Sequence, residues 1–522
     1  MHSNDHTYFV ILDAASIQNK VADLFPKRII LFDQSWGVYL PDNAASESKS
    51  QLIPFNHASE IFLAMSGPAM WLGTLLVAGL VVAHQLKASK SWLMKASIAY
   101  GISLGFISLS ALLLMLAGIP LIPPVIVFIT ILWFASSLFL WLATKKRELR
   151  LERKKLTGWL AIRSMDSWPV IFLFFSLIGT ILSVGKGYHT SDSIVLWGAK
   201  GYGIASQGLI SGASDWGTST TRYPLHIPIL IAAFKVLFGE ILPASKLIFP
   251  LYYFALLGIM YAYLQTKIPR IIAGLSTLTL ASIPLLFRHA QIAYANLPFT
   301  FYFLSAVLIS LEAINDTSET SRNNRFLLGG IFFVLSSWTR PEGIPLTIIT
   351  LLLIILLGAP QLRRTFRKTI VLWTAPMVIF SFLWFTVSGH IYVHPGQNTR
   401  LFSNALSHIL RGELHLMEAG YILKYLVTEL VSPSTWGVVG IGLLLFILSG
   451  IFSLGTEFFS PAVVSGLVFL VIMTGIYYLT SFDETHDISW WVSTGLNRMI
   501  MPGVVLLWVG SAESLFNRDR SP

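Results

Sequence analysis

The chain has 522 residues, of which 54% are hydrophobic and 12% are charged, and its mean hydropathy is +0.68. Soluble domains carry about 25% charged residues, so this composition excludes a soluble globular protein and a solvated disordered chain. The absence of cysteine excludes disulfides, zinc–thiolate sites and thiol nucleophiles. The net charge of +10 lies mostly in short loops beside apolar runs, which indicates a membrane protein rather than a nucleic-acid-binding one.

Residues 1–58 are mixed and polar, contain no apolar signal-peptide core, and predict a tail to which no role is assigned. Apolar runs follow almost to the end of the chain, each long enough to span a bilayer or to form a shorter helix inside a bundle. They lie at 61–83, 92–117, 121–143, 168–185, 246–264, 271–287, 297–314, 327–339, 343–358, 369–388, 433–455, 460–480 and 497–513. The sequence therefore predicts an all-α polytopic membrane protein with about 13 transmembrane helices.

Basic clusters predict the orientation of these helices, because cytoplasmic loops are enriched in Lys and Arg. With every run counted as a crossing, four clusters fall on one side: 87–95, 145–155, 267–270 and 363–368. Three long segments, 186–245, 389–432 and 481–496, then lie outside. The stretch 224–239 is about 16 residues long and carries His226 and Lys235, so it predicts an amphipathic helix lying in the membrane interface.

The first outer segment holds a set of polar residues that could carry chemistry. Asp192 follows a predicted membrane helix directly, and Trp197 and Lys200 lie about one and two helical turns further on. This spacing can hold a carboxylate at the membrane surface while a lysine faces a lipid phosphate. A carboxylate there could act as a general base, and Lys or Arg could stabilise a departing phosphate.

Several short motifs together resemble the GT-C superfamily of membrane glycosyltransferases, which includes protein O-mannosyltransferases and aminoarabinose transferases of lipid A. The motifs are Asp192 in the first large outer loop, Trp-x-x-Lys at 197–200, Arg-Tyr-Pro-Leu-x-x-Pro at 222–228, Trp-Thr-Arg-Pro-Glu-Gly at 338–343 and Asn-Arg-Met-Ile-Met-Pro at 497–502. The resemblance covers roughly 165–513. It divides the chain into the polar tail 1–58, extra helices at 59–164 and a GT-C-like catalytic module at 165–522.

The resemblance implies transfer of a sugar from a polyprenyl-phosphate carrier to a glycan, lipid or protein acceptor on the outer face, by a single inverting displacement. It implies a multi-pass protein of a bacterial or archaeal cell membrane, with Asp192 as the catalytic base. The substrate-binding residues that it indicates are Lys200, Arg222, His226, Asn296, Arg340, Glu342 and Arg498. No organic cofactor is implied.

Two features depart from the family pattern. Three extra helices precede the acidic loop, and Asn296 stands in the stretch Ala-Tyr-Ala-Asn-Leu-Pro where the family often has a second aspartate. An amide is a poorer ligand than a carboxylate for a hard divalent cation, so the sequence leaves dependence on a divalent metal open.

Structural alternatives exist for each of these residues. Asp192 could cap the helix that follows it, and Lys200 or Arg222 could anchor the chain at the headgroups. Arg340 and Glu342 could simply pair with each other around Pro341. Arg498 opens the last apolar run, where a helix dipole disfavours a cation unless a phosphate is bound. The pair Trp490–Trp491 could anchor the chain in the membrane interface or stack on a sugar.

Two other functional classes stay open from the sequence. A transporter or lipid flippase would place its site near the membrane midplane and often shows inverted repeats, which are not visible here. A polysaccharide polymerase or ligase would use arginine and histidine in a large outer loop, and the segment 389–432 offers Arg400, His408, Arg411 and His415. The acidic residues at 483–487 read as a solvated loop.

Overall fold

The computed structural model describes residues 10–13, 29–31, 36–39, 58–89, 91–148, 166–186, 188, 190, 192–211, 223–239, 242–362, 366–391, 397–453, 460–482 and 487–517. The chain divides into two compact units, Met1–Gly67 and Pro68–Pro522. The first unit contains three short strands, β1 (Val10–Asp13), β2 (Ile29–Leu31) and β3 (Trp36–Tyr39). They form an antiparallel sheet in the order β1-β3-β2, in which Tyr39 pairs with both Val10 and Ile29.

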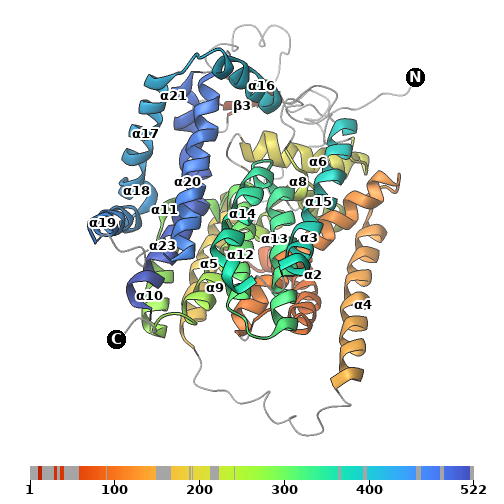
Figure 1. Ribbon diagram of the computed structural model, residues 1–522. Coiled ribbons are helices and arrows are strands. Elements are labelled where there is room, and N and C mark those ends of the chain that lie inside the picture. The colour runs from red at the N-terminus through yellow and green to blue at the C-terminus, as the bar shows by residue number, and fades with distance from the viewer. Residues whose placement is uncertain are drawn as a thin grey trace. The chain divides into compact units, whose positions relative to one another are not determined.

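The second unit is helical throughout the part that the structure describes (Figure 1). Its first half contains α2 (Ala58–Gln85, which begins in the first unit), α3 (Trp92–Leu116), α4 (Pro123–Glu148), α5 (Trp168–Lys186), the π-helix η2 (Ser193–Gly198), α6 (Ala199–Gln207), α8 (His226–Phe238), the 3₁₀-helix η3 (Leu242–Leu247), α9 (Ile248–Leu264), α10 (Arg270–Ala281), α11 (Pro284–His289) and α12 (Asn296–Ile314). Its second half contains α13 (Glu319–Thr339), α14 (Gly343–Leu362), α15 (Phe366–Ile391), α16 (Gln397–Leu410), α17 (Leu416–Leu430), α18 (Pro433–Trp436), α19 (Val438–Ser453), α20 (Pro461–Leu479), η5 (Thr480–Phe482), α21 (Ile488–Trp491), η6 (Val492–Leu496), α22 (Asn497–Met499) and α23 (Met501–Phe516).

The apolar runs predicted from the sequence are mainly helical where they are described, and the runs 271–287, 433–455 and 497–513 are broken into two helices each. Among the described residues, seven helices are long and apolar enough to cross a membrane, and the bent pair Ile488–Met499 and Met501–Phe516 makes up to eight. Five further apolar helices are shorter. A multi-pass membrane protein is therefore compatible with the structure, whereas the number of about 13 crossings stays a prediction.

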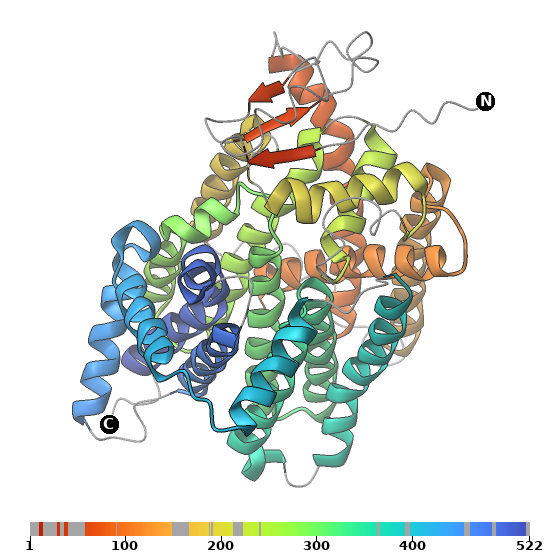
Figure 2. The same ribbon diagram turned by 90° about the horizontal axis from the view of Figure 1, so that it is seen from above.

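The helices differ greatly in how much of their apolar surface the protein covers. In α12 94% of the most apolar stretch is buried, and this helix packs along α13, α9 and α14. The corresponding buried share is 22% in α4 and 28% in α15, whose exposed side chains include Phe139 and Phe382. Large exposed apolar surfaces are rare on soluble proteins, so lipid is the natural solvent for these faces. Figures 1 and 2 show α4 at one margin of the bundle and α17 to α19 at the opposite margin.

Two polar clusters occupy opposite ends of the same helices. Asp166 precedes α5, receives a hydrogen bond from the Tyr261 hydroxyl at 2.5 Å and pairs with Arg270 at 2.7 Å. Near the ends of α12 and α23 lie Glu312, 3.4 Å from Arg325, and Glu513, which accepts from Tyr263 at 3.0 Å. Asp192, Asn296 and Arg498 lie at the other ends of these three helices. The predicted separation of Arg270 from the candidate site is thus present in the fold.

Helix α8, predicted as an interfacial helix, is buried by protein over His226–Phe234 and packs on α6 and α3. Its position relative to the interface stays a prediction. The imidazole of His226 lies 2.7 Å from Ser108 Oγ and 2.9 Å from Tyr252 Oη. Trp338 Nε1 donates to the same Ser108 hydroxyl at 3.1 Å. Helix α3, from the predicted extra segment, is therefore joined by buried hydrogen bonds to α8 and α13 within one unit.

This network gives a prediction about stability. We expect His226→Leu to lower the free energy of unfolding by about 1–3 kcal/mol, because buried hydroxyl groups of Ser108 and Tyr252 lose a partner. Thermal unfolding in detergent measures the change. The control is His84→Leu, because His84 is exposed near the end of α2. Equal melting temperatures for the two variants would show that the network contributes nothing to stability.

Candidate functional site

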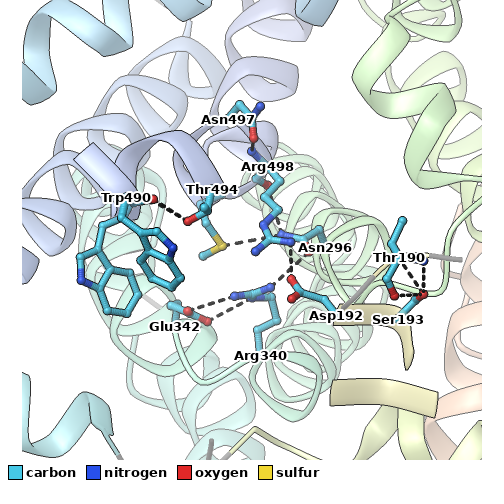
Figure 3. Close-up of polar contacts among 12 residues, drawn as sticks. Thr190, Asp192, Ser193, Asn296, Arg340, Glu342, Trp490, Thr494, Asn497 and Arg498 are labelled. Atoms are coloured by element: carbon cyan, nitrogen blue, oxygen red, sulfur yellow. Dashed lines mark hydrogen bonds and ion pairs between the residues drawn. The ribbon is translucent and has the colours of Figure 1, made fainter. Parts of the chain in front are cut away.

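The candidate site forms where several helix ends meet at one end of the bundle (Figure 3). The segment after α5 supplies Asp192, the start of α12 supplies Asn296, and the turn between α13 and α14 supplies Arg340 and Glu342. Arg498 comes from α22, just before α23. Residues separated by up to about 300 positions in the sequence thus contact one another. Helix ends can hold such a polar site, because backbone groups there lack partners within the helix and polar side chains are tolerated.

Asp192 and Arg498 form the first ion pair of the site, with 2.5 Å between Asp192 Oδ2 and Arg498 Nη1. Both side chains are about one quarter exposed, so the pair is within reach of a ligand. The residues on either side of Asp192 are linked, because Ser193 Oγ donates to the Thr190 carbonyl at 2.7 Å and fixes the local turn. The alternative that Asp192 caps the following helix is wrong, because its side chain makes no capping hydrogen bond and turns to Arg498 instead.

Arg340 and Glu342 form a second, more buried pair. Arg340 donates from Nε and Nη2 to the two carboxylate oxygens of Glu342, both at 3.2 Å, and from Nη1 to Asn296 Oδ1 at 3.2 Å. The mutual pairing considered from the sequence is therefore observed, and it extends to Asn296. Asn296 Nδ2 in turn donates to the Arg498 carbonyl at 3.4 Å. The amide of Asn296 thus links the two arginines.

Aromatic rings pack against the cations of the site. The guanidinium of Arg340 lies 5.4 Å from the centre of the Tyr223 ring, and Lys200 Nζ lies 6.0 Å from the same ring. Arg498 lies 5.2 Å from the centre of the Tyr294 ring. The negative faces of these rings stabilise the cations electrostatically. Lys200, Arg340 and Arg498 thus all lie near aromatic rings at this end of the bundle, and Arg340 and Arg498 are also paired with carboxylates.

Burial shifts the protonation of two groups at this end of the bundle. It lowers the pKa of Lys200 to about 8, so this lysine loses its charge as the pH rises through about 8. Burial, together with the nearby Arg498, Arg288 and Arg340, also lowers the pKa of His289 to about 3. His289 is therefore a neutral imidazole, and its Nδ1 is buried without a hydrogen-bond partner among the described residues.

The sequence missed three residues at this site: Tyr223, Tyr294 and His289. Tyr223 and Tyr294 lie inside motifs that were singled out, next to Arg222 and Asn296, but their own chemistry gave no signal. His289 belongs to none of the motifs described from the sequence. What places it here is the short helix α11, which ends beside Tyr294, with the two ring centres 5.6 Å apart.

Other residues singled out from the sequence lie elsewhere. The imidazole of His226 contacts Ser108, Tyr252 and Tyr302, none of which belongs to the site. Arg222 and the acidic positions 483 and 484 fall outside the described residues. The dipole argument for Arg498 is wrong. Arg498 lies near the end of the helical run Ile488–Met499, where a cation is favoured, rather than at a helix start.

The histidines of the segment 389–432 are engaged locally. His415 stacks on Phe482 with ring centres 4.1 Å apart, and its Nδ1 lies 3.1 Å from the Ser481 hydroxyl. His408 pairs with Glu413. Within the described part of the chain no group of three or more histidines and carboxylates could hold a metal ion. Dependence on a divalent metal stays untested.

Comparison with protein-family models, with curated proteins and with solved structures found no match to this chain. The resemblance to GT-C transferases therefore stays an expectation from short motifs. The geometry of the site carries the functional argument instead.

The two arginines should respond differently to substitution. We expect Arg340→Met to destabilise the fold by about 3–5 kcal/mol, because it leaves the largely buried Glu342 without a partner. Arg498→Met should cost about 1 kcal/mol or less, because its pair with Asp192 is partly exposed. Thermal unfolding of both variants in detergent tests this. The opposite order would show that Arg498 holds the fold together.

Proposed function

We propose that this protein is a membrane glycosyltransferase that moves a sugar from a polyprenyl-phosphate carrier to an acceptor at the outer face of a cell membrane. The observation that carries the proposal is the partly exposed ion pair of Asp192 and Arg498 at one end of a helical bundle with exposed apolar faces, where Arg340 and Lys200 lie near the ring of Tyr223. A lipid-linked phosphate needs both an apolar surrounding for its tail and cations for its head group. The exposed apolar faces of the helices and the accessible Arg498 support both requirements.

In the proposed reaction the acceptor hydroxyl oxygen attacks the anomeric carbon of the donor. A bond forms between these atoms, the bond from the anomeric carbon to the phosphate oxygen breaks, and its electron pair leaves with the lipid phosphate. Asp192 takes the proton of the acceptor hydroxyl. The single displacement inverts the configuration of the anomeric carbon. This displacement needs a base on one side of the sugar and cations on the other.

The ion pair between Asp192 and Arg498 suggests how donor binding prepares the base. A phosphate that binds Arg498 competes with Asp192 for the guanidinium. The Asp192 oxygen released in this way can accept the proton of the acceptor. Arg340 has a different role in this proposal, because its donors are occupied by Glu342 and Asn296. It supports the site, while Arg498 and Lys200 bind the phosphate.

The first test removes the proposed base. We expect Asp192→Asn to lower the transfer rate about 10²–10⁴-fold, the usual contribution of a general base. The full chain in nanodiscs is offered a panel of polyprenyl-phosphate sugars together with membrane extract as the acceptor source, and release of polyprenyl phosphate is measured. The matched control is Asp166→Asn, which breaks an Asp–Arg pair at the opposite end of the same helix. Equal rates for wild type and Asp192→Asn would remove Asp192 as the base. A protein that moves lipid across vesicles but releases no phosphate would be a flippase.

The second test uses pH. Because burial lowers the pKa of Lys200 to about 8, the lysine is charged below this pH and neutral above it. The donor phosphodiester stays a monoanion throughout, so its affinity should fall as pH rises from about 7 to about 9. We expect Lys200→Arg to remove this fall, since arginine stays charged. The donor KM measured across this range reports the effect. The same fall in Lys200→Arg would exclude Lys200 as a phosphate ligand.

A further inference from the structure

A pair of tryptophans lies on the helical run that carries Arg498. Trp490 is 43% exposed, Trp491 is partly buried, and their rings meet edge to face with centres 5.0 Å apart. Asp487 fixes the start of this run, because its Oδ1 accepts from the Trp490 backbone N–H at 2.8 Å and from Ser489 Oγ at 2.8 Å. The two indoles are therefore held on an ordered helix start.

The helical run connects this pair to the ion pair of the site. Thr494 Oγ1 donates to the Trp490 carbonyl at 2.6 Å, and Arg498 follows four residues after Thr494 on the same run, which is a π-helix over Val492–Leu496. Figure 3 shows Trp490, Thr494 and Arg498 following one another toward Asp192, with Glu342 on the side of Trp490. Buried Val492 and Leu496 anchor the opposite face of the run in the protein.

Resting on the function proposed above, we infer that the acceptor is a carbohydrate chain whose sugar ring stacks on Trp490 and Trp491. A sugar ring has faces of C–H groups and a rim of hydroxyls. The electron-rich faces of two perpendicular indoles suit the C–H faces. The hydroxyl of Thr494 and the carboxylate of Glu342 suit the rim. The stacked ring places the next sugar of the acceptor toward Asp192, which accepts the proton of its hydroxyl.

A polypeptide acceptor fits this surface less well. Extended peptides bind most simply by adding to a sheet edge, and the described part of the unit from Pro68 onward contains no strand. An apolar helix would need an apolar groove. Here the exposed indoles are instead surrounded by Asp487, Ser489, Ser493 and Thr494, of which the last three carry hydroxyls. Alternating aromatic and hydroxyl groups match a sugar.

The experiment measures transfer of a labelled sugar to the acceptors present in membranes of the producing cells. The donor is the polyprenyl-phosphate sugar that wild type consumes in the preceding assay. We expect the label in a product that resists protease and is cleaved by glycosidases or periodate. We expect Trp490→Ala and Trp491→Ala to raise the acceptor KM about tenfold, the change expected for loss of one stacking contact. Donor KM should not change. Trp490→Tyr should restore most of the acceptor affinity.

The control is Trp92→Ala, because Trp92 is 61% exposed at the start of α3, outside the site. Label in protease-sensitive protein would overturn the inference. An acceptor KM unchanged in both tryptophan variants would overturn it as well, and would leave the pair as a membrane anchor. Absence of any phosphate release by wild type is a different result, because it refutes the glycosyltransferase proposal itself.

Discussion

Charged groups inside an apolar helical bundle need partners, and this constraint shapes the structure. An unpaired charge in such surroundings costs several kcal/mol, which favours the pairing of carboxylates with cations. The pairs Asp192–Arg498 and Asp166–Arg270 satisfy this requirement at the two ends of α5. Between these ends the helices are apolar and either pack together or face outward. These ion pairs therefore lie at helix ends.

The two ion pairs of the candidate site differ in exposure and in surroundings. The pair of Arg340 and Glu342 is largely buried and makes three hydrogen bonds through the guanidinium, including one to Asn296. The neighbouring pair of Asp192 and Arg498 is more exposed and contacts the ring of Tyr294. A rigid pair beside a more accessible one suits a site that binds a charged ligand, because the first holds the geometry while the second can exchange partners. The proposed transfer reaction uses both properties.

The helices α2 to α4, which precede the motif-bearing part of the chain, belong to the same compact unit from Pro68 onward. Their link to the rest is polar as well as apolar. Ser108 of α3 receives a hydrogen bond from Trp338, two residues before Arg340, and also contacts His226. A buried and satisfied network of this kind favours one arrangement of the helices over others, since every partner is lost if the helices shift. The extra helices thus support the segment that carries Arg340.

The sequence by itself determined the helices, because long apolar runs with few charges can satisfy their backbone only as helices in lipid. It also selected Asp192, Lys200, Asn296, Arg340, Glu342 and Arg498, which the structure brings to one end of the bundle. Hydropathy could not tell the buried α12 from the exposed α4, since core and lipid are equally apolar. Local pattern suggested a helix cap for Asp192 and indicated no protein partner for the imidazole of His226. Tertiary packing decided instead on Arg498 and on the Ser108–Tyr252 network. The physical reason is that the partner of a buried polar group comes from whichever helix packs nearby, and that neighbour is fixed only when the whole bundle is assembled.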